Sequence, residues 1–369
     1  MSRPPGTFTA PLAPFRGEPS PVGTTRSSPS RIVGGTPSNG DVIKYYIVAQ
    51  DQATAANLWY TPFAGASHSD VNTQNSAPTT PNSYTISGAS LAGSYIIGPG
   101  QTYTSLTNAG GLFEAINNGA LSGDLVASIA TDINELGLNA LNQWSETGTG
   151  GYTLTIQPDA ASERLLYGDV SISGGMIRLN GADRVRIDGR FSGSGRYFRF
   201  RNNNTAQPVF TLLNDASADT VRNCFIESGC TSTGAIVIGA GVTTGNDNTV
   251  IAQNVIRDRT DITTTPLYAG IYSNIASTSY ASAGATISDN EIVNPTSYGM
   301  YLNSTSIGDA WSITGNSVYF NHPTLSSLAI AGIWFAPGIG ANGHTVSGNA
   351  IGGNAANCGG TVWTNAYTS

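Results

Sequence analysis

The sequence has 369 residues and is acidic, with a formal net charge of -7 at neutral pH and a pI of about 4.9. Charged residues make up only 11% of it, and Lys44 is the only lysine. This composition argues against general nucleic-acid binding, which depends on a basic surface. The 45 glycines, together with many Ser, Thr and Asn residues, favour strands and turns over helices.

The first hundred residues divide into three segments of different composition. Residues 1–30 are rich in proline and poor in aliphatic side chains, so they are expected to be disordered or extended. Residues 31–75 contain a strong strand pattern at Asp41–Asp51 and a shorter one at Leu58–Tyr60. These strands resemble the last strands of an immunoglobulin-like or fibronectin-like sandwich. Because two or three strands cannot bury both faces of a sheet, the segment is not expected to form a complete sandwich alone. Residues 76–102 are interpreted as a linker.

Residues 103–369 predict an all-β fold, a right-handed parallel β-helix, from a pattern that recurs at unequal steps. Each copy has an aliphatic residue, two further residues, an Asn, one residue and a second aliphatic. Four copies lie at 250–256, 286–292, 312–318 and 345–351. Two earlier copies start at Val185 and Val221, with Asp188 and Cys224 at the Asn position. Unequal steps suit stacked coils of short strands with variable loops, but not a helical solenoid.

The recurring Asn predicts a sharp bend in each coil, because Asn enters the left-handed region of backbone space more easily than most residues. Stacked coils would then bring these side chains together in a structural Asn ladder at one corner. Its members are Asn254, Asn290, Asn316 and Asn349. A further strand in each coil, entered through Gly, is expected at 234–237, 270–273, 299–302 and 332–335.

A short capping helix is expected at the start of the solenoid, since an open coil end exposes core and strand edges. Within residues 106–116, Leu112, Phe113 and Ile116 have helical spacing, and Gly119 is a suitable stop.

Cysteine and histidine positions do not indicate a metal site. Cys224 and Cys230 are near enough for a local disulfide, while Cys358 leaves the count odd. The three histidines, His68, His322 and His344, are scattered, and no paired Cys spacing is present. No cofactor is expected.

Arginines crowd into the first coils of the solenoid. The possible binding patch, for an acidic polysaccharide or another partner, consists of Arg178, Arg184, Arg186 and Arg222. The alternative, which the sequence favours, is a solvated sheet face whose charge is balanced by nearby aspartates. These are Asp183, Asp188, Asp215 and Asp219.

Several runs carry a resemblance to a known group of proteins. They are Thr102–Leu106, Ala115–Gly119, Leu179–Arg190 and Leu213–Ser217. These runs resemble the right-handed β-helix segment of large, adhesin-like bacterial secreted and cell-surface proteins associated with type IX secretion. The resemblance implies an extracellular or cell-surface location and sandwich modules before the helix, and it carries over no catalytic residue. Without a signal peptide, the chain is expected to be a fragment of a longer protein.

Three functions follow as hypotheses. The favoured one is a non-catalytic adhesive or structural protein, with a polysaccharide, a cell-surface partner or a second copy as its partner and no nucleic acid or membrane insertion. The alternative is a polysaccharide lyase or glycoside hydrolase of the pectin-degrading type, with Asp258, Arg259 and Asp261 as catalytic candidates and Ca²⁺ needed by a lyase. The same residues also fit a loop with internal ion pairs. The third is a flat-surface glycan or ice binder using outward Ser and Thr residues.

Overall fold

The computed structural model describes residues 7–9, 42–45, 47–50, 58–61, 80–85, 88–262, 267–273, 280–305, 307–321 and 330–362. The chain forms two compact units, Met1–Ala89 and Ser90–Ser369. Most of the segment expected to be disordered, residues 1–30, lies outside the described residues, and so do His68 and His322.

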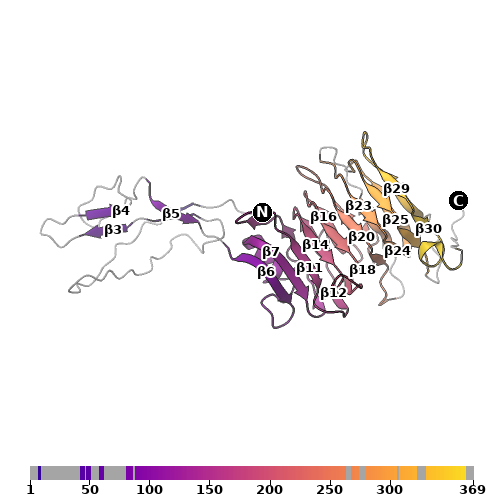
Figure 1. The fold of residues 1–369 in the computed structure, drawn as a ribbon, viewed down its shortest axis with the longest axis horizontal. Coiled ribbons are helices and arrows are strands. Elements are labelled where there is room, and N and C mark those ends of the chain that lie inside the picture. The colour runs from indigo at the N-terminus through magenta and orange to yellow at the C-terminus, as the bar shows by residue number, and fades with distance from the viewer. Residues whose placement is uncertain are drawn as a thin grey trace. The chain divides into compact units, whose positions relative to one another are not determined.

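The first unit contains two small sheets (Figure 1). In one, β2 (Val42–Tyr45) pairs in parallel with β1 (Thr7–Thr9) and antiparallel with β5 (Asn82–Thr85). In the other, β3 (Ile47–Gln50) and β4 (Leu58–Thr61) are antiparallel. The single strand expected at Asp41–Asp51 is therefore two strands in different sheets, because each half has its own antiparallel partner.

The second unit is a parallel β-helix, as predicted, built from three sheets whose strands stack coil upon coil (Figure 1). Sheet I contains β6 (Ser90–Ile97), β7 (Ala120–Ile129), β10 (Ser145–Glu146), β11 (Leu154–Pro158), β14 (Val185–Asp188), β17 (Thr220–Arg222), β20 (Val250–Ala252), β23 (Thr286–Ser288), β26 (Ser312–Thr314) and β29 (Thr345–Ser347). Sheet II contains β8 (Ile133–Asn134), β12 (Arg164–Gly168), β15 (Phe198–Asn202), β18 (Cys224–Ser228), β21 (Val255–Arg257), β24 (Glu291–Val293), β27 (Ser317–Tyr319) and β30 (Ala350–Ile351). Sheet III contains β9 (Leu141–Asn142), β13 (Ile177–Asn180), β16 (Phe210–Leu213), β19 (Gly234–Ile238), β22 (Leu267–Ser273), β25 (Pro295–Asn303) and β28 (Ala331–Ala336). From β11 to β28 the chain visits sheets I, II and III in that order in each coil, and β29 and β30 add strands to sheets I and II.

The β-helix starts earlier than the sequence predicts. Strand β6 lies within the range 76–102 that was interpreted as a linker, yet it pairs in parallel with β7. Leu91 and Ile97 on this strand are fully buried. The strand belongs to the core because these two side chains lose contact with water only by packing against the next coil.

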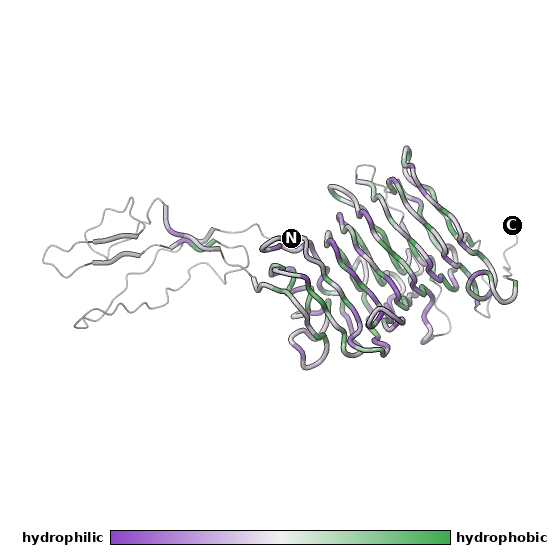
Figure 2. The backbone as a smooth tube through the Cα atoms, viewed as in Figure 1, coloured by the Kyte–Doolittle hydropathy of each residue, from purple (hydrophilic) through white to green (hydrophobic). Residues whose placement is uncertain are grey.

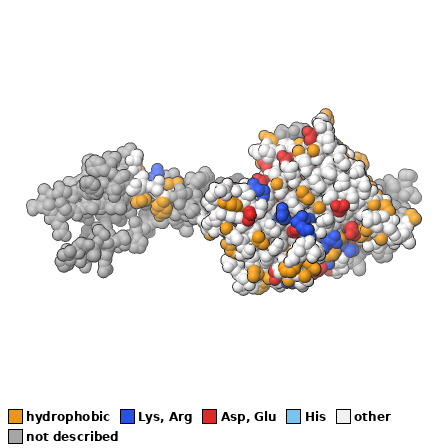
Figure 3. All heavy atoms as spheres, in the orientation of Figure 1, with side chains coloured by type: hydrophobic (Ala, Val, Ile, Leu, Met, Phe, Trp, Pro, Cys, Tyr) orange, Lys and Arg blue, Asp and Glu red, His pale blue; other side chains and the backbone are white. Residues whose placement is uncertain are grey.

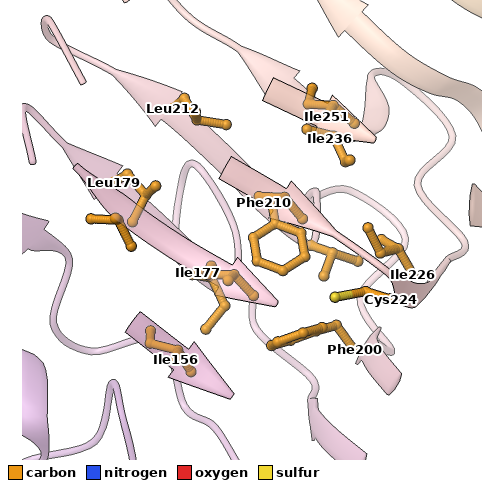
Figure 4. Packing of buried hydrophobic residues seen from close by; sticks show 14 of the residues in the cluster. Ile156, Ile177, Leu179, Phe200, Phe210, Leu212, Cys224, Ile226, Ile236 and Ile251 are labelled. Atoms are coloured by element: carbon orange, nitrogen blue, oxygen red, sulfur yellow. The ribbon is translucent and has the colours of Figure 1, made fainter. Parts of the chain in front are cut away.

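Inward side chains of successive coils stack to form one continuous core. In sheet I the paired residues Ile187, Val221, Ile251 and Ile287 are almost completely buried. Phe200 and Phe210 bring sheets II and III together, with their ring centroids 4.8 Å apart in an edge-to-face arrangement (Figure 4). Hydrophobic residues recur in this way along the stacked strands (Figure 2).

Strand β14 pairs with β17 in a register that differs from the one predicted by the repeated sequence pattern, which aligns Val185 with Val221. Ile187, not Val185, lies beside Val221, so Asp188 pairs with Arg222 and does not take the Asn position. Val185 and Ile187 are both buried on the same strand. Because inward positions alternate with a period of two, the hydrophobic pattern fits either register, and the neighbouring coil selects one.

The predicted capping helix is confirmed as α1 (Leu112–Asn118), which ends at Gly119. Its Leu112, Phe113 and Ile116 side chains are completely buried. The helix packs against β9, the edge strand of sheet III, and against β7. It therefore covers core side chains at the first coils, where no further strand of sheet III is available.

Four asparagines, Asn254, Asn290, Asn316 and Asn349, form the asparagine row. The Asn290 amide nitrogen donates hydrogen bonds to Asn316 Oδ1 (2.9 Å) and to the Ile251 carbonyl (2.8 Å). Its Oδ1 accepts from the backbone N–H and the side-chain amide of Asn254, both at 3.0 Å. Asn316 repeats these contacts with Asn349 and the Ile287 carbonyl. The amides of Asn254, Asn290 and Asn316 thus each join their own coil to both neighbours, and Asn349 bonds to the coil before it.

The backbone at this corner differs from the prediction that Asn itself adopts the left-handed conformation. The residue before each Asn has the positive φ: 58° at Gln253, 54° at Asp289, 66° at Gly315 and 65° at Gly348. The preceding residue therefore makes the bend. This arrangement leaves the Asn side chain free to point into the protein, where it satisfies backbone groups.

The glycines of sheet III permit close packing. Ile271, Met300 and Ile333 pair in successive coils, so Gly270, Gly299 and Gly332 align, whereas Gly234 is one residue out of step. A Cβ atom on Gly299 would lie 2.3 Å from the Gly332 carbonyl oxygen and 2.8 Å from both Val318 methyl groups. These glycines are required by the close approach of sheets II and III.

Replacing Asn290 by Ala should lower the free energy of unfolding by about 2–4 kcal/mol, because several buried donors and acceptors lose their partners. Chemical denaturation monitored by circular dichroism would measure the loss. Asn118→Ala, at an exposed position of α1, is the matched control and should change little. Equal stability of the two variants would contradict a stabilising role of the asparagine row.

Candidate functional site

The catalytic candidates lie where the chain leaves β21, and their charged groups are engaged with one another. Arg259 donates to both Asp261 carboxylate oxygens, from Nε at 3.0 Å and from Nη2 at 2.8 Å. This contact lowers the pKa of Asp261 below its usual value. Asp258 is 9% exposed and accepts a hydrogen bond from Asn294 Nδ2 at 2.9 Å. A general acid must carry a proton near neutral pH, so the ionised Asp261 is poorly suited to that role.

The same loop joins an ion-pair network on the outer face of sheet II. Glu227 is completely buried between Arg199 and Arg201, and Arg201 Nε donates to Glu227 Oε2 at 2.7 Å. Arg199 also binds Glu163 through two hydrogen bonds of 2.9 and 3.0 Å, which lowers the pKa of Glu163. Arg201 Nη1 lies 3.3 Å from Asp261 Oδ2. Basic and acidic side chains lie close together on the face shown in Figure 3. Basic and acidic groups thus alternate along this network, and each has a partner within the protein.

The four arginines of the predicted binding patch do not share one face. Arg178 is on sheet III and donates to the Gly137 carbonyl at 2.6 Å. Arg184 precedes β14, and Arg222 on β17 donates to Asp188 Oδ2 at 2.9 and 2.7 Å. Arg186 is exposed on β14 and has no ion pair among the residues that the structure describes. Three of the four arginines are therefore committed to contacts within the chain.

Arg184 takes part in a compact contact around Glu146. The Glu146 carboxylate accepts from the backbone N–H of Gly151 (2.8 Å) and Tyr152 (2.9 Å), and from Trp144 Nε1 (3.1 Å). Arg184 Nη2 adds an ion pair at 2.8 Å. The hydrogen bond from Gly151 is the main cause that lowers the pKa of Glu146 to about 2, and Trp144, Tyr152 and Arg184 add to it.

The three cysteines form no disulfide. Cys224 and Cys230 are free and completely buried, and Cys358 is free and exposed. Burial raises the pKa of the Cys224 thiol well above its usual value, so the nucleophilic thiolate is disfavoured. No group of three His, Cys, Asp or Glu side chains within the described ranges is arranged to hold a metal ion.

Outward hydroxyl groups form two short columns on sheet I. Thr286, Ser312 and Thr345 pair in successive coils, and so do the neighbouring Ser288, Thr314 and Ser347. In the preceding coil the same positions are Val250 and Ala252, so the hydroxyl surface covers only three coils.

Sheet III carries a row of aromatic side chains to which the sequence analysis assigned no role. We call it the aromatic strip, and it consists of Tyr268, Tyr272, Tyr298, Tyr301 and Trp334. Tyr272 pairs with Tyr301, and Tyr301 pairs with Trp334. The Tyr272 and Tyr301 rings are stacked with centroids 5.4 Å apart, and the Trp334 ring is 6.2 Å from Tyr301. Trp334 is 47% exposed, and the four tyrosines are partly exposed.

The aromatic strip is electrically neutral. The strands β22, β25 and β28 contain no Asp, Glu, Lys, Arg or His. The pKa of Tyr268 is raised, mainly by burial and then by Tyr298 and Tyr272, so its hydroxyl keeps its proton at neutral pH. Asn303 Nδ2 donates to the Tyr301 hydroxyl at 2.9 Å. The strip therefore combines apolar aromatic surface with neutral hydroxyl groups.

A sequence signal for the strip exists. In three successive coils a Gly is followed by an aliphatic residue and then by an aromatic one, at 270–272, 299–301 and 332–334. The glycines of these runs mark the strands, and the third residues of the runs form part of the strip.

Comparisons with known proteins give no relative: no protein-family model, curated protein or solved structure matches the chain. Among the described residues, no helix combines the length and apolar character needed to cross a membrane.

The Glu146 contacts predict a pH-dependent stability. Because the pKa of Glu146 is lowered in the folded chain, its stabilising effect is present above its ordinary pKa of about 4.5 and is lost as pH falls towards 2. Glu146→Gln should therefore lower the thermal midpoint at pH 7, and its difference from the unsubstituted chain should shrink below pH 4. Calorimetry between pH 7 and pH 2.5 would measure this. A difference independent of pH would contradict the assignment.

Proposed function

We propose that this chain is a non-catalytic extracellular module that adheres to a polysaccharide or cell-surface partner through one face of its β-helix. The observation that carries the proposal is the aromatic strip, a set of partly exposed rings on a regular parallel sheet. Exposed aromatic side chains on soluble proteins are commonly associated with binding, because leaving them in water is unfavourable. A stack of hydrogen-bonded coils holds these rings at defined spacing.

The charged groups support binding rather than catalysis. Catalysis of glycoside hydrolysis needs one carboxyl group that holds a proton and a second that stays ionised across the sugar bond. Asp261 is ionised by its contact with Arg259, and Asp258 is largely buried beside Asn294. Both carboxylates thus have partners within the protein. We interpret this loop as a structural connection.

Composition and sequence resemblance support the extracellular location. The chain is poor in charge and rich in Gly, Ser, Thr and Asn. Its β-helix resembles those of bacterial secreted and cell-surface proteins, in which sandwich modules precede the helix. We include in this proposal that the first unit, with strands β1 to β5, is part of such a module.

A second candidate function uses the hydroxyl columns of sheet I. Regularly spaced Thr and Ser side chains on a flat sheet suit the binding of a glycan surface or of ice. The three coils that carry both columns make a smaller surface than a periodic crystal face requires. The aromatic strip is therefore the better-supported binding surface.

The proposal predicts binding without turnover. The purified chain is incubated with neutral and acidic polysaccharides, with and without Ca²⁺, while released sugars and co-sedimentation are both measured. We expect co-sedimentation with at least one polysaccharide and no released product. Asp261→Asn should bind as the unsubstituted chain does. Product release that Asp258→Asn or Asp261→Asn abolishes would establish the enzyme alternative, and long assemblies of the chain alone would favour a structural role.

A further inference from the structure

The aromatic strip has a chemistry that selects one class of ligand. We propose that it binds an uncharged polysaccharide whose sugar rings pack against the exposed parts of the aromatic side chains and whose chain follows the direction in which the coils stack. This inference rests on the proposed adhesive function and adds to it the site, the ligand class and the orientation of the ligand.

The aromatic side chains of the strip repeat along the coils, as the sugar rings of a polysaccharide repeat along its chain. Tyr272, Tyr301 and Trp334 occupy the same position in three successive coils, and adjacent strands of a sheet lie about 4.8 Å apart. A polysaccharide likewise presents one ring after another along an extended chain. Its rings have faces of C–H groups, which pack against apolar aromatic surface, and edges of hydroxyl groups. The ligand can thus contact several coils at once.

Neutral hydroxyl groups on the strip suit the edges of a sugar ring. Tyrosine hydroxyls both donate and accept hydrogen bonds, and the raised pKa of Tyr268 keeps its hydroxyl protonated. The Asn303 amide, which donates to the Tyr301 hydroxyl, orients that group and leaves the hydroxyl proton available to a ligand. The strip therefore offers hydrogen bonds beside its apolar surface.

The charge distribution argues against an acidic polysaccharide at this site. Strands β22, β25 and β28 carry no basic side chain that could pair with a carboxylate or sulfate group. The arginines that could serve an acidic ligand, such as Arg199 and Arg201, belong to sheet II and bind Glu227.

The size of the strip argues against a protein partner of standard affinity. A stable protein interface takes about 20–30 residues from each side, whereas the strip has five rings on three strands. Trp334 is its most exposed member, and Tyr301 contacts the rings of Tyr272, Tyr298 and Trp334. These two residues are expected to contribute most to binding, as large aromatic anchors usually do.

Affinity electrophoresis and tryptophan fluorescence titration of the full chain would test the site. The probes are xyloglucan, β-1,3-glucan and mannan as neutral polysaccharides, and polygalacturonate and alginate as acidic ones. Trp334→Ala and Tyr301→Ala are compared with Tyr167→Ala, whose ring is 37% exposed on sheet II. We expect binding of at least one neutral probe, a loss of tenfold or more for both strip variants, and unchanged affinity for the control.

Four results would overturn the inference. They are unchanged neutral-glycan binding by both strip variants, preference for the acidic probes, dimers of the chain that Trp334→Ala abolishes, and no binding of any probe. Unchanged binding by the strip variants, or preference for the acidic probes, would be consistent with an adhesive function at a different site. Product release sensitive to Asp261→Asn refutes the non-catalytic function and is independent of the strip variants. Thermal midpoints of all variants confirm folding, and the two strip variants test the site independently.

Discussion

The stacking of each coil on the next, with equivalent residues in register, is the constraint on which this β-helix depends. A single coil cannot bury its inward side chains, so Ile251 leaves water only because Val221 and Ile287 lie beside it. The asparagine row meets the same requirement for polar groups, since the amides of Asn254, Asn290 and Asn316 bond to the coils before and after their own. The core and the polar corner are therefore two results of one repeated geometry.

Outward side chains at equivalent positions of successive coils also lie in columns. The chemistry of these columns differs from sheet to sheet. On sheet II, Arg201, Glu227 and Arg257 pair in sequence, so neighbouring charges have opposite sign and attract. Sheet I has columns of Ser and Thr hydroxyl groups, and sheet III has a column of aromatic side chains. Like charges on adjacent strands would repel one another, whereas aromatic rings or hydroxyl groups can occupy the same position in successive coils without repulsion. Neutral columns are thus the ones available to bind a repeating ligand.

The catalytic candidates lie close together in the sequence, and their charged groups contact side chains of sheet II. The run from Arg257 to Asp261 leaves β21, where outward arginines of sheet II already require acidic partners. Asp261 pairs with Arg259 and Arg201, and Thr260 donates to Glu227 at 2.8 Å. The compact group of charges is therefore part of the network that covers sheet II.

The sequence by itself determined the parallel β-helix, the short helix α1 and the inward aliphatic positions, because these depend on local periodicity. It could also have revealed the aromatic strip, since the Gly–aliphatic–aromatic runs are local. Only the tertiary structure decided the register of β14, where Val185 and Ile187 are equally suited to the core, and the inclusion of β6 in the first coil. It also decided which arginines pair with which carboxylates. Partners such as Arg201 and Glu227 lie in different coils, and the loops between them differ in length, so no local sequence pattern predicts which residues meet.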